Sequence, residues 1–235
     1  MAQINKPSDY FNTVLYTGNG STGQSITGVG FQPDWTWLKL RSITGNNGLF
    51  DCVRGATKRL QSNQTNAEDT ISSFASFDSD GFTLSGASQN NDTETFASWN
   101  WLAANGTSSN TDGTITSTVS ANTTAGFSIC TYTGNGTSGA TFGHGLNSAP
   151  EMVIVKRRDT TGNWIVGHVG ADSTFAQVLN LNLSNAKATA NSIFNSTAPT
   201  SSVVTLGNEG DANGNTNTFV AYCFHGVKVY LKFGS

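Results

Sequence analysis

Residues that could carry out catalysis are few and scattered. The three histidines lie far apart in the sequence: His144, His168 and His225. No pattern places a nucleophile beside any of them, as nucleophilic catalysis requires. Glycoside hydrolysis needs two carboxylates in one cleft. The acidic pairs in this chain, Asp78 with Asp80 and Glu68 with Asp69, occur in turn and helix-cap contexts that account for them. We therefore predict no catalytic residues and no enzyme activity.

Metal and cofactor motifs are also incomplete. Residues 78–81 and 208–215 alternate oxygen-bearing side chains with glycine, as calcium loops do, but neither completes a known loop pattern. Cys52, Cys130 and Cys223 are odd in number and share no metal-ligand spacing. Cys130 and Cys223 lie in apolar runs, so we expect buried thiols made in a reducing cytoplasm. The sequence predicts no metal site and no cofactor.

Aromatic residues beside polar ones offer the best candidate for ligand binding, because the faces of pyranose rings stack on aromatic rings. Four tryptophans occur at a spacing of two within predicted strands, which favours core packing: Trp35, Trp37, Trp99 and Trp101. Trp164 follows Asn163 and is the better candidate for an exposed ring. We therefore predict Trp164 and Asn163 as ligand-binding residues.

The chain consists of one module written twice. Tyr-Thr-Gly-Asn-Gly occurs at residues 16–20 and again at residues 132–136. Further matches follow in the same order, among them 33–39 with 150–156 and 95–101 with 218–224. Ordered matches of this kind indicate a duplicated supersecondary unit, and such arrays present a binding surface more often than they house one active site.

Composition predicts the fold class and excludes some partners. Ser, Thr and Asn make up about a third of the chain, and only 11% of residues are charged. Thr, Val, Phe and Trp suit pleated strands, and Gly, Asn and Ser suit the turns between them, so an all-β fold is expected. A net charge of −3 gives no electrostatic case for binding nucleic acid. No apolar run is long enough for a membrane span, and no signal-peptide core is seen.

We predict two tandem, duplicated antiparallel β-sandwich modules of jelly-roll or lectin-like type. The first covers residues 1–104 and the second residues 125–235, with a Ser/Thr/Asn/Gly-rich linker at 105–124. Part of the linker could lie extended along a module, because Ile115 and Val119 interrupt its polar sequence. Short loop helices are predicted at 66–74 and 184–192. The inward-facing residues should include Trp37, Leu38, Phe82, Leu84, Phe96, Val153, Val155, Leu206, Phe219 and Tyr222.

The last apolar run, residues 227–233, resembles the opening strand of a further copy. An unpaired strand leaves backbone donors and acceptors open, so this strand should pair with a sheet edge or with another subunit. The predicted subunit-contact residues are Val227, Val229, Tyr230, Leu231 and Phe233. We expect a homo-oligomer, first of all a trimer, by analogy with fibres and because appendages gain strength from multivalency.

Several motifs resemble a repeat-domain family found in structural proteins of marine tailed bacteriophages. They include Val-Gly-Phe-Gln-Pro at 29–33, Val-Arg-Gly-Ala at 53–56 and Phe-Asp-Ser-Asp-Gly-Phe at 77–82, besides the repeated pentapeptide. The likeness continues to Lys-Phe-Gly-Ser at 232–235 and so spans nearly the whole chain. It implies a virion protein made in the host cytoplasm, described as tail-fibre-like, and it supplies no catalytic residues. The resemblance departs in length, because the chain has no coiled coil, attachment domain or peptidase-like tail.

Two functions follow as expectations. The first is a non-enzymatic, tail-fibre-like receptor-binding protein whose loops recognise a host surface glycan during attachment. The alternative is a decoration or fibre-base protein of the capsid or tail, which binds other virion proteins. Brevity favours the alternative, whereas the variable loops favour glycan recognition.

Overall fold

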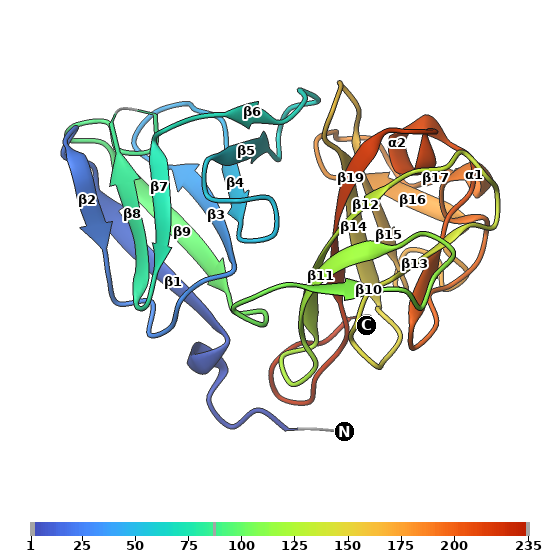
Figure 1. Ribbon diagram of the computed structural model, residues 1–235. Helices are drawn as coiled ribbons and strands as arrows, with labels where there is room; N and C mark the ends of the chain where they lie inside the picture. Colours follow the sequence, from blue (N-terminus) through green and yellow to red (C-terminus); the bar gives the residue numbers. More distant parts are fainter. Residues whose placement is uncertain (1–2, 87, 234–235) are drawn as a thin grey trace. The chain divides into compact units, whose positions relative to one another are not determined.

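A computed structural model describes residues 3–86 and 88–233 and shows an all-β protein with short helices (Figure 1). The chain divides into two compact units. We call residues 6–64 and 68–106 the N-terminal unit. The C-terminal unit comprises residues 107–233 of the described chain, together with the segments 3–5 and 65–67.

The N-terminal unit is an antiparallel β-sandwich. It begins with a 3₁₀-helix, η1, at Pro7–Asp9. Its large sheet has the order β1-β9-β3-β4-β5-β6, and its small sheet has the order β2-β8-β7. The large sheet consists of β1 (Phe11–Thr17), β9 (Thr95–Trp101), β3 (Trp35–Leu40), β4 (Gly48–Asp51), β5 (Lys58–Gln61) and β6 (Asp69–Thr70). The small sheet consists of β2 (Thr22–Ile26), β8 (Gly81–Ser85) and β7 (Phe74–Asp78). Leu38, Phe50, Phe74 and Phe82 pack between the two sheets.

The C-terminal unit repeats this plan and extends it. Its large sheet has the order β10-β11-β12-β19-β14-β15-β16-β17, and β13 pairs with β18 in a small second sheet. The strands of the large sheet are β10 (Ser108–Asn110), β11 (Ser117–Asn122), β12 (Phe127–Thr133), β19 (Thr218–Phe224), β14 (Met152–Arg157), β15 (Trp164–His168), β16 (Gln177–Asn180) and β17 (Ala188–Thr189). The other elements are β13 (Thr141–Gly143), β18 (Val203–Thr205), α1 (Asn191–Phe194) and α2 (Gly210–Asn213).

Strand register confirms the duplication. In the first copy Tyr16 lies opposite Phe96, and in the second Tyr132 lies opposite Phe219. The strand that follows the conserved proline also keeps its register, because Trp35 lies opposite Trp101 just as Met152 lies opposite Phe224. The order β1-β9-β3-β4-β5-β6 therefore corresponds to β12-β19-β14-β15-β16-β17.

The predicted core is confirmed with two exceptions. Nine of the ten residues predicted to face inward are buried. Of these, Tyr222 lies on the face of β19 opposite the core residues Phe219, Ala221 and Cys223. The other exception is Trp37, which is only half-buried and whose ring contacts those of Trp35 and Trp99. Side chains alternate between the two faces of a strand, so Leu38, which packs with the core, places Trp37 on the other face of β3. Cys130 and Cys223 are buried free thiols, as expected.

The predicted helices are largely wrong. Residues 66–74 contain no helix; Asp69 and Thr70 form β6, which pairs with β5, and Phe74 begins β7. Residues 184–192 contain β17 and only the first two residues of α1. Neither segment has an amphipathic stripe long enough to stabilise a helix by packing, so pairing with a neighbouring strand prevails.

The segment predicted as a linker follows the alternative in which part of it lies extended along a module. Residues 108–110 and 117–122 form β10 and β11, a hairpin that lies at the edge of the C-terminal unit's large sheet (Figure 1). Val119 and Ile115, the two apolar residues that interrupt the polar sequence, are both buried in the core cluster. Only alternate residues of an edge strand face the core, so a strand at this place can be largely polar.

In each copy, the acidic residue that follows the repeated proline accepts hydrogen bonds from backbone N–H groups just after the last strand of that copy. The Asp34 carboxylate accepts hydrogen bonds from the backbone N–H groups of Ala103 (2.6 Å) and Asn105 (3.0 Å). In the second copy, the Glu151 carboxylate accepts one from the Gly226 N–H (3.2 Å). Burial raises the pKa of Asp34, and these backbone donors offset the increase only in part.

The raised pKa of Asp34 predicts a pH effect on stability. In this case the folded protein holds the proton more tightly than the unfolded chain, for which an aspartate pKa is about 3.9. The contribution of Asp34 to the free energy of unfolding should therefore rise as the pH falls from neutral through the folded pKa. Asp34→Asn should abolish this contribution, so that wild type gains stability relative to the variant on acidification. Urea unfolding of both proteins between pH 7 and 4 tests this, and a difference that does not vary with pH would contradict it.

Candidate functional site

The repeated pentapeptide forms a loop that is closed by a buried asparagine from a distant segment. In the first copy, Asn90 accepts a hydrogen bond from the Asn19 N–H (3.0 Å) and donates to the Ser21 carbonyl (2.9 Å). The Tyr16 hydroxyl donates to the Gln89 carbonyl (2.8 Å). Asn90 is fully buried, so the loop and the segment before β9 are held as one piece.

The second copy repeats these contacts. Asn213 accepts from the Asn135 N–H (2.9 Å) and donates to the Thr137 carbonyl (3.0 Å) and the Gly207 carbonyl (2.7 Å). A Cβ atom added at Gly134 would lie 2.5 Å from a backbone carbonyl oxygen, so only glycine allows this approach. The conserved pentapeptide therefore has a structural role in both copies.

The predicted ligand-binding tryptophan is not exposed. Trp164 is fully buried in β15, its backbone N–H donates to Asn182 (2.9 Å), and its ring stacks on Tyr222. Asn163 is half-buried and accepts a hydrogen bond from the Asn182 side chain (2.9 Å). A ring without an exposed face cannot stack on a sugar, so the expectation of an exposed ring at Trp164 is wrong. Asn163 lies just before β15, and its hydrogen bonds to Asn182 and Asp211 hold it within its own unit.

The predicted terminal strand is also wrong, because residues 227–231 form a closed turn. Val227 and Leu231 exchange two backbone hydrogen bonds (2.8 and 2.9 Å), and the Tyr230 N–H donates to the Val227 carbonyl (3.0 Å). Val229 has a positive φ of 71°, an unusual value for a β-branched residue, and its side chain is 67% exposed. Val227, Tyr230 and Leu231 are thus bonded within the turn, and Lys228 forms a parallel bridge with Gln3, so the segment is not an open terminal strand and the argument for an oligomer built through one no longer applies.

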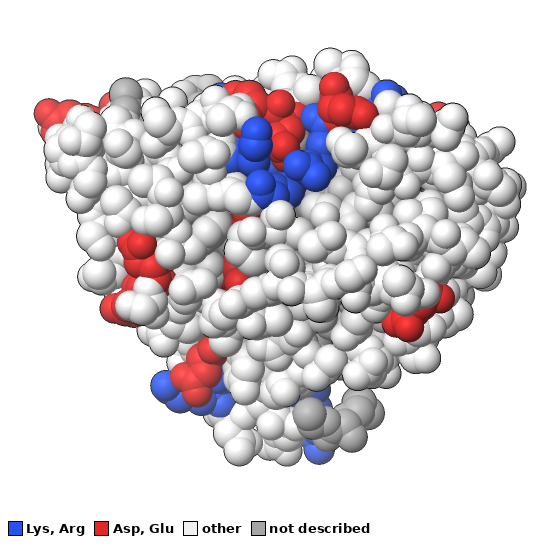
Figure 2. Space-filling view, viewed as in Figure 1, with Lys and Arg blue, Asp and Glu red and all other residues white. Residues whose placement is uncertain are grey.

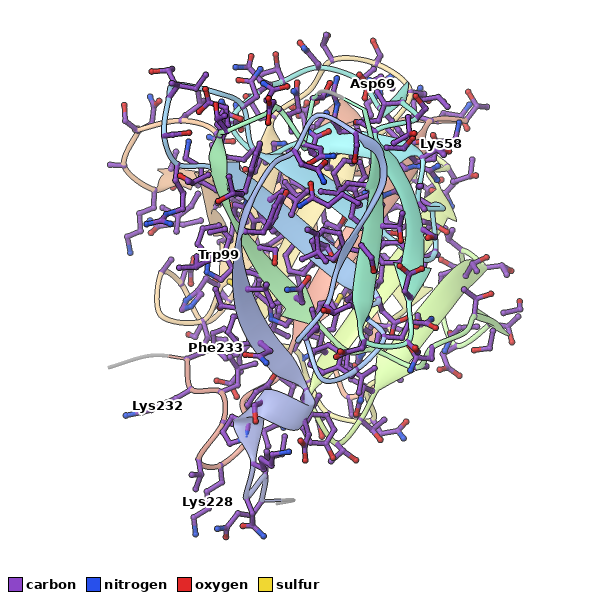
Figure 3. All side chains as sticks on the ribbon, turned by 90° about the vertical axis from the view of Figure 1, so that its left-hand side faces the viewer. Lys58, Asp69, Trp99, Lys228, Lys232 and Phe233 are labelled. Atoms are coloured by element: carbon purple, nitrogen blue, oxygen red, sulfur yellow. The ribbon has the colours of Figure 1, made fainter. Side chains whose placement is uncertain are left out.

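Phe233 lies after this turn and contacts the C-terminal unit. Its ring lies against those of His168 and Phe224, while Lys228 and Lys232 extend into solvent (Figure 3). A hollow of about 550 Å³ beside it is lined by the turn residues and Glu151. The segment folds back on its own unit, and Tyr230 and Leu231 remain half-buried.

The histidines are held separately by backbone groups. His144 is buried, and its Nδ1 accepts from the Leu146 N–H (3.2 Å) while Nε2 lies 3.2 Å from the Thr200 carbonyl. Burial lowers the pKa of His144 and so favours the neutral ring. His168 accepts from the Gly170 N–H (2.9 Å). Within the described ranges, no group of three or more His, Cys, Asp or Glu side chains is placed to hold a metal ion.

A concave site with a polar lining lies within the N-terminal unit. We call it the β5 hollow; its volume is about 210 Å³. Its floor is formed by Leu38, Leu40, Gly48 and Phe96. Its polar lining comes from β5, from the loop between β3 and β4 and from the segment before β9: Asn46, Arg59, Gln61, Ser88 and Gln89.

Hydrogen bonds fix the polar groups of the β5 hollow in place. Arg59 makes a two-pronged ion pair with Asp69 on β6, with N–O distances of 3.1 and 2.5 Å. Lys58 and Asp69 lie at the same end of this unit (Figure 3). Gln89 is buried, and its side-chain carbonyl accepts from the Ser73 hydroxyl (2.7 Å). Planar amide and guanidinium groups that are oriented before a ligand arrives can bind hydroxyl groups without a further loss of side-chain freedom.

A glycine creates the β5 hollow in only one copy. Gly48 lies opposite Leu38, and the corresponding residue opposite Val155 in the second copy is Ile165. An added Cβ at Gly48 would lie 2.9 Å from the Phe50 ring and 3.4 Å from the Gln89 side-chain nitrogen. In the first copy the Phe50 ring and the Gln89 side chain thus take the place that the isoleucine side chain occupies in the second copy, where Ile165 belongs to the packed core.

Beneath the hollow, the two copies fill the same part of the core with aromatic rings from different positions in the chain. Phe50 corresponds to Gly167, where an added Cβ would lie 2.3 Å from the ring of Phe175. Phe50 thus fills from its own strand the volume that Phe175 and Phe194 fill in the second copy. Sequence reasoning missed the hollow; the usable signal was a glycine within an apolar strand, which often marks a close approach or an open site.

Comparison with known proteins identifies a family but no activity. Residues 6–235 match the model of a domain of unknown function, DUF7483, and the chain belongs to that family. No curated protein and no solved structure matches the chain significantly. In the described part of the chain, no helix has the length and apolar character needed to cross a membrane.

Proposed function

We propose that this chain is a non-enzymatic module of a bacteriophage virion appendage and that it binds a surface glycan through the β5 hollow. The observation that carries the proposal is the polar lining of the hollow, in which Arg59 and Gln89 are already fixed by hydrogen bonds. The proposal keeps the recognition function expected from the repeat and from the virion-protein resemblance. It moves the site from Trp164 to the N-terminal unit.

The size of the hollow indicates the ligand class. A volume of about 210 Å³ is smaller than the clefts that take drug-sized molecules, so it suits one sugar ring with its neighbours in solvent. Amide groups can both donate to and accept from hydroxyls, and the guanidinium of Arg59 adds donors. The ring face of Phe96 is buried, so recognition would rest on hydrogen bonds rather than on stacking.

The face of the molecule that Figure 2 shows is compatible with a neutral ligand. Figure 2 shows a face on which uncharged residues predominate and basic side chains lie beside acidic ones. Mixed charge of this kind gives no strong field of one sign to attract a polyanion. We therefore expect binding to a neutral glycan to depend only weakly on salt.

A glycan array tests the proposed function, and a matched pair of variants tests the site. Gln61→Ala removes a polar group from the hollow, whereas Asn180→Ala makes a similar change at the corresponding position of β16. We expect saturable binding by wild type, at least about tenfold weaker binding by Gln61→Ala because one or two hydrogen bonds are lost, and wild-type binding by Asn180→Ala. Absence of saturable binding to any glycan, or equal losses in the two variants, would overturn the proposal.

A further inference from the structure

The two large sheets differ at one edge. In the C-terminal unit, β12 lies between β19 and β11. The corresponding strand of the N-terminal unit, β1, pairs with β9 on one side and forms the edge of its sheet (Figure 1). Within the described residues no strand occupies the other side of β1. One copy thus carries an added hairpin, β10–β11, at a position that is vacant in the other.

The hydrogen bonds at the two ends of β1 show which of its backbone groups point toward β9 and which point to the open side. The Tyr10 carbonyl accepts from the Leu102 N–H (2.9 Å), and the Gly18 N–H donates to the Glu94 carbonyl (2.8 Å). Even-numbered residues of β1 therefore direct their backbone groups toward β9. Because these directions alternate along a strand, the odd-numbered residues face the open side.

Two of the outward backbone groups toward the ends of β1 have local partners, but the middle is open. The Thr13 N–H donates to the Asn12 side chain (2.9 Å), and the Thr17 carbonyl accepts from Gln24 (2.9 Å). No hydrogen bond to the backbone of Leu15 from any described residue is seen on this side. The Leu15 side chain is 61% exposed. A long edge strand with an exposed apolar residue is a template for pairing with another strand.

Burial along the two equivalent strands shows what the missing hairpin would cover. Val14 is only half-buried, whereas its equivalent Cys130 is fully buried opposite Val119 of β11. The flank of the N-terminal core is therefore covered less completely at the place where β11 would lie.

The opposite edges of the two sheets do not offer such a surface. These edges are β6 and β17, and each has two residues. Very short edge strands are one of the ways in which proteins prevent unwanted strand pairing. By contrast, β1 has seven residues and no proline.

We propose that β1 is an acceptor edge that binds an extended strand of another polypeptide, with the alternating small and polar pattern of β11. The chain itself shows this interaction at the equivalent edge, where β11 pairs antiparallel with β12 over six residues. Transfer of that register places Thr118 of the added strand opposite Leu15 and Ser120 opposite Thr13. The partner is thus a strand like Ser117–Asn122, supplied by a neighbouring polypeptide in an assembly.

A peptide of residues 115–124 is the probe, and N-methylation of its backbone is the discriminating change. In the transferred register, the N–H groups of Thr118 and Ser120 point to β1, and those of Val119 and Ala121 point away. The unmodified peptide should bind the intact chain saturably in isothermal calorimetry. N-methylation at Thr118 and Ser120 should weaken binding at least about tenfold, whereas N-methylation at Val119 and Ala121 should change it little.

The protein side supplies a second test. Leu15→Pro removes an outward N–H from β1, and proline is tolerated on the open side of an edge strand. This variant should keep the circular dichroism spectrum of wild type and lose peptide binding, while Gln61→Ala should bind the peptide normally. Failure of the unmodified peptide to bind, or equal effects of the two methylation patterns, would overturn the proposal. A free chain that dimerises through β1 and excludes the peptide would contradict the assigned occupant.

Discussion

Asn213→Ala should destabilise the C-terminal unit by about 3–4 kcal/mol, because each buried polar group left without a partner costs about 1–3 kcal/mol. The Asn213 side chain is fully buried. Its removal leaves the Asn135 N–H and the carbonyls of Thr137 and Gly207 without their partner. Urea unfolding followed by circular dichroism measures the change.

The matched control for this change lies two residues away. Asn215 is exposed, so Asn215→Ala makes the same chemical change at the surface and should alter stability by less than about 0.5 kcal/mol. Asn90→Ala should have a comparable effect on the N-terminal unit, since Asn90 makes the equivalent contacts. A loss below about 1 kcal/mol for Asn213→Ala would show that the pentapeptide loop does not depend on this residue.

Arg54→Ala should cost about 3–5 kcal/mol, the range found when one partner of a buried ion pair is removed. The Arg54 side chain is fully buried and pairs with Asp51 (2.5 Å) and with Glu68 (2.9 Å). It also donates to the carbonyls of Leu49 (3.1 Å) and Lys58 (3.2 Å). The variant leaves the carboxylates buried without the guanidinium, so thermal unfolding should shift to lower temperature.

Arg59→Ala is the control for the ion-pair prediction. Arg59 pairs with Asp69, whose side chain is 49% exposed, and solvent-exposed pairs contribute about 0–1 kcal/mol. The two substitutions remove the same side chain from the same unit and differ chiefly in burial. Equal losses of stability would contradict the view that the buried Arg54 network, and not arginine content as such, holds this unit together.

Sequence reasoning succeeded where local pattern and tertiary structure agree. The duplication followed from an identical pentapeptide, and the structure shows the same strand register in both copies. The buried asparagines were missed, although Asn90 and Asn213 each lie five residues before the Thr-Phe pair that opens the last strand. Their partners in the pentapeptide loops, Asn19 and Asn135, are 71 and 78 residues away in the chain, so the sequence shows no local reason for their conservation between the copies.

The failures have physical causes that composition could not reveal. Trp164 was predicted to be exposed because it follows a polar residue, but its ring is buried and stacks on Tyr222 of β19. The terminal segment alternates like a strand, yet Val229 adopts a positive φ that turns the chain back. The β5 hollow could not be predicted, because it depends on a missing side chain at Gly48 and on Gln89 from a distant segment.

The measurement that tests the central claim most directly is a nuclear magnetic resonance titration of the side-chain amide and guanidinium groups with the glycan that binds best. The account predicts saturable shift changes at Asn46, Arg59, Gln61 and Gln89, which line the β5 hollow, and none at Asn163 or Asn180. Changes confined to the C-terminal unit, or the same changes in wild type and in the Gln61→Ala variant, would contradict it.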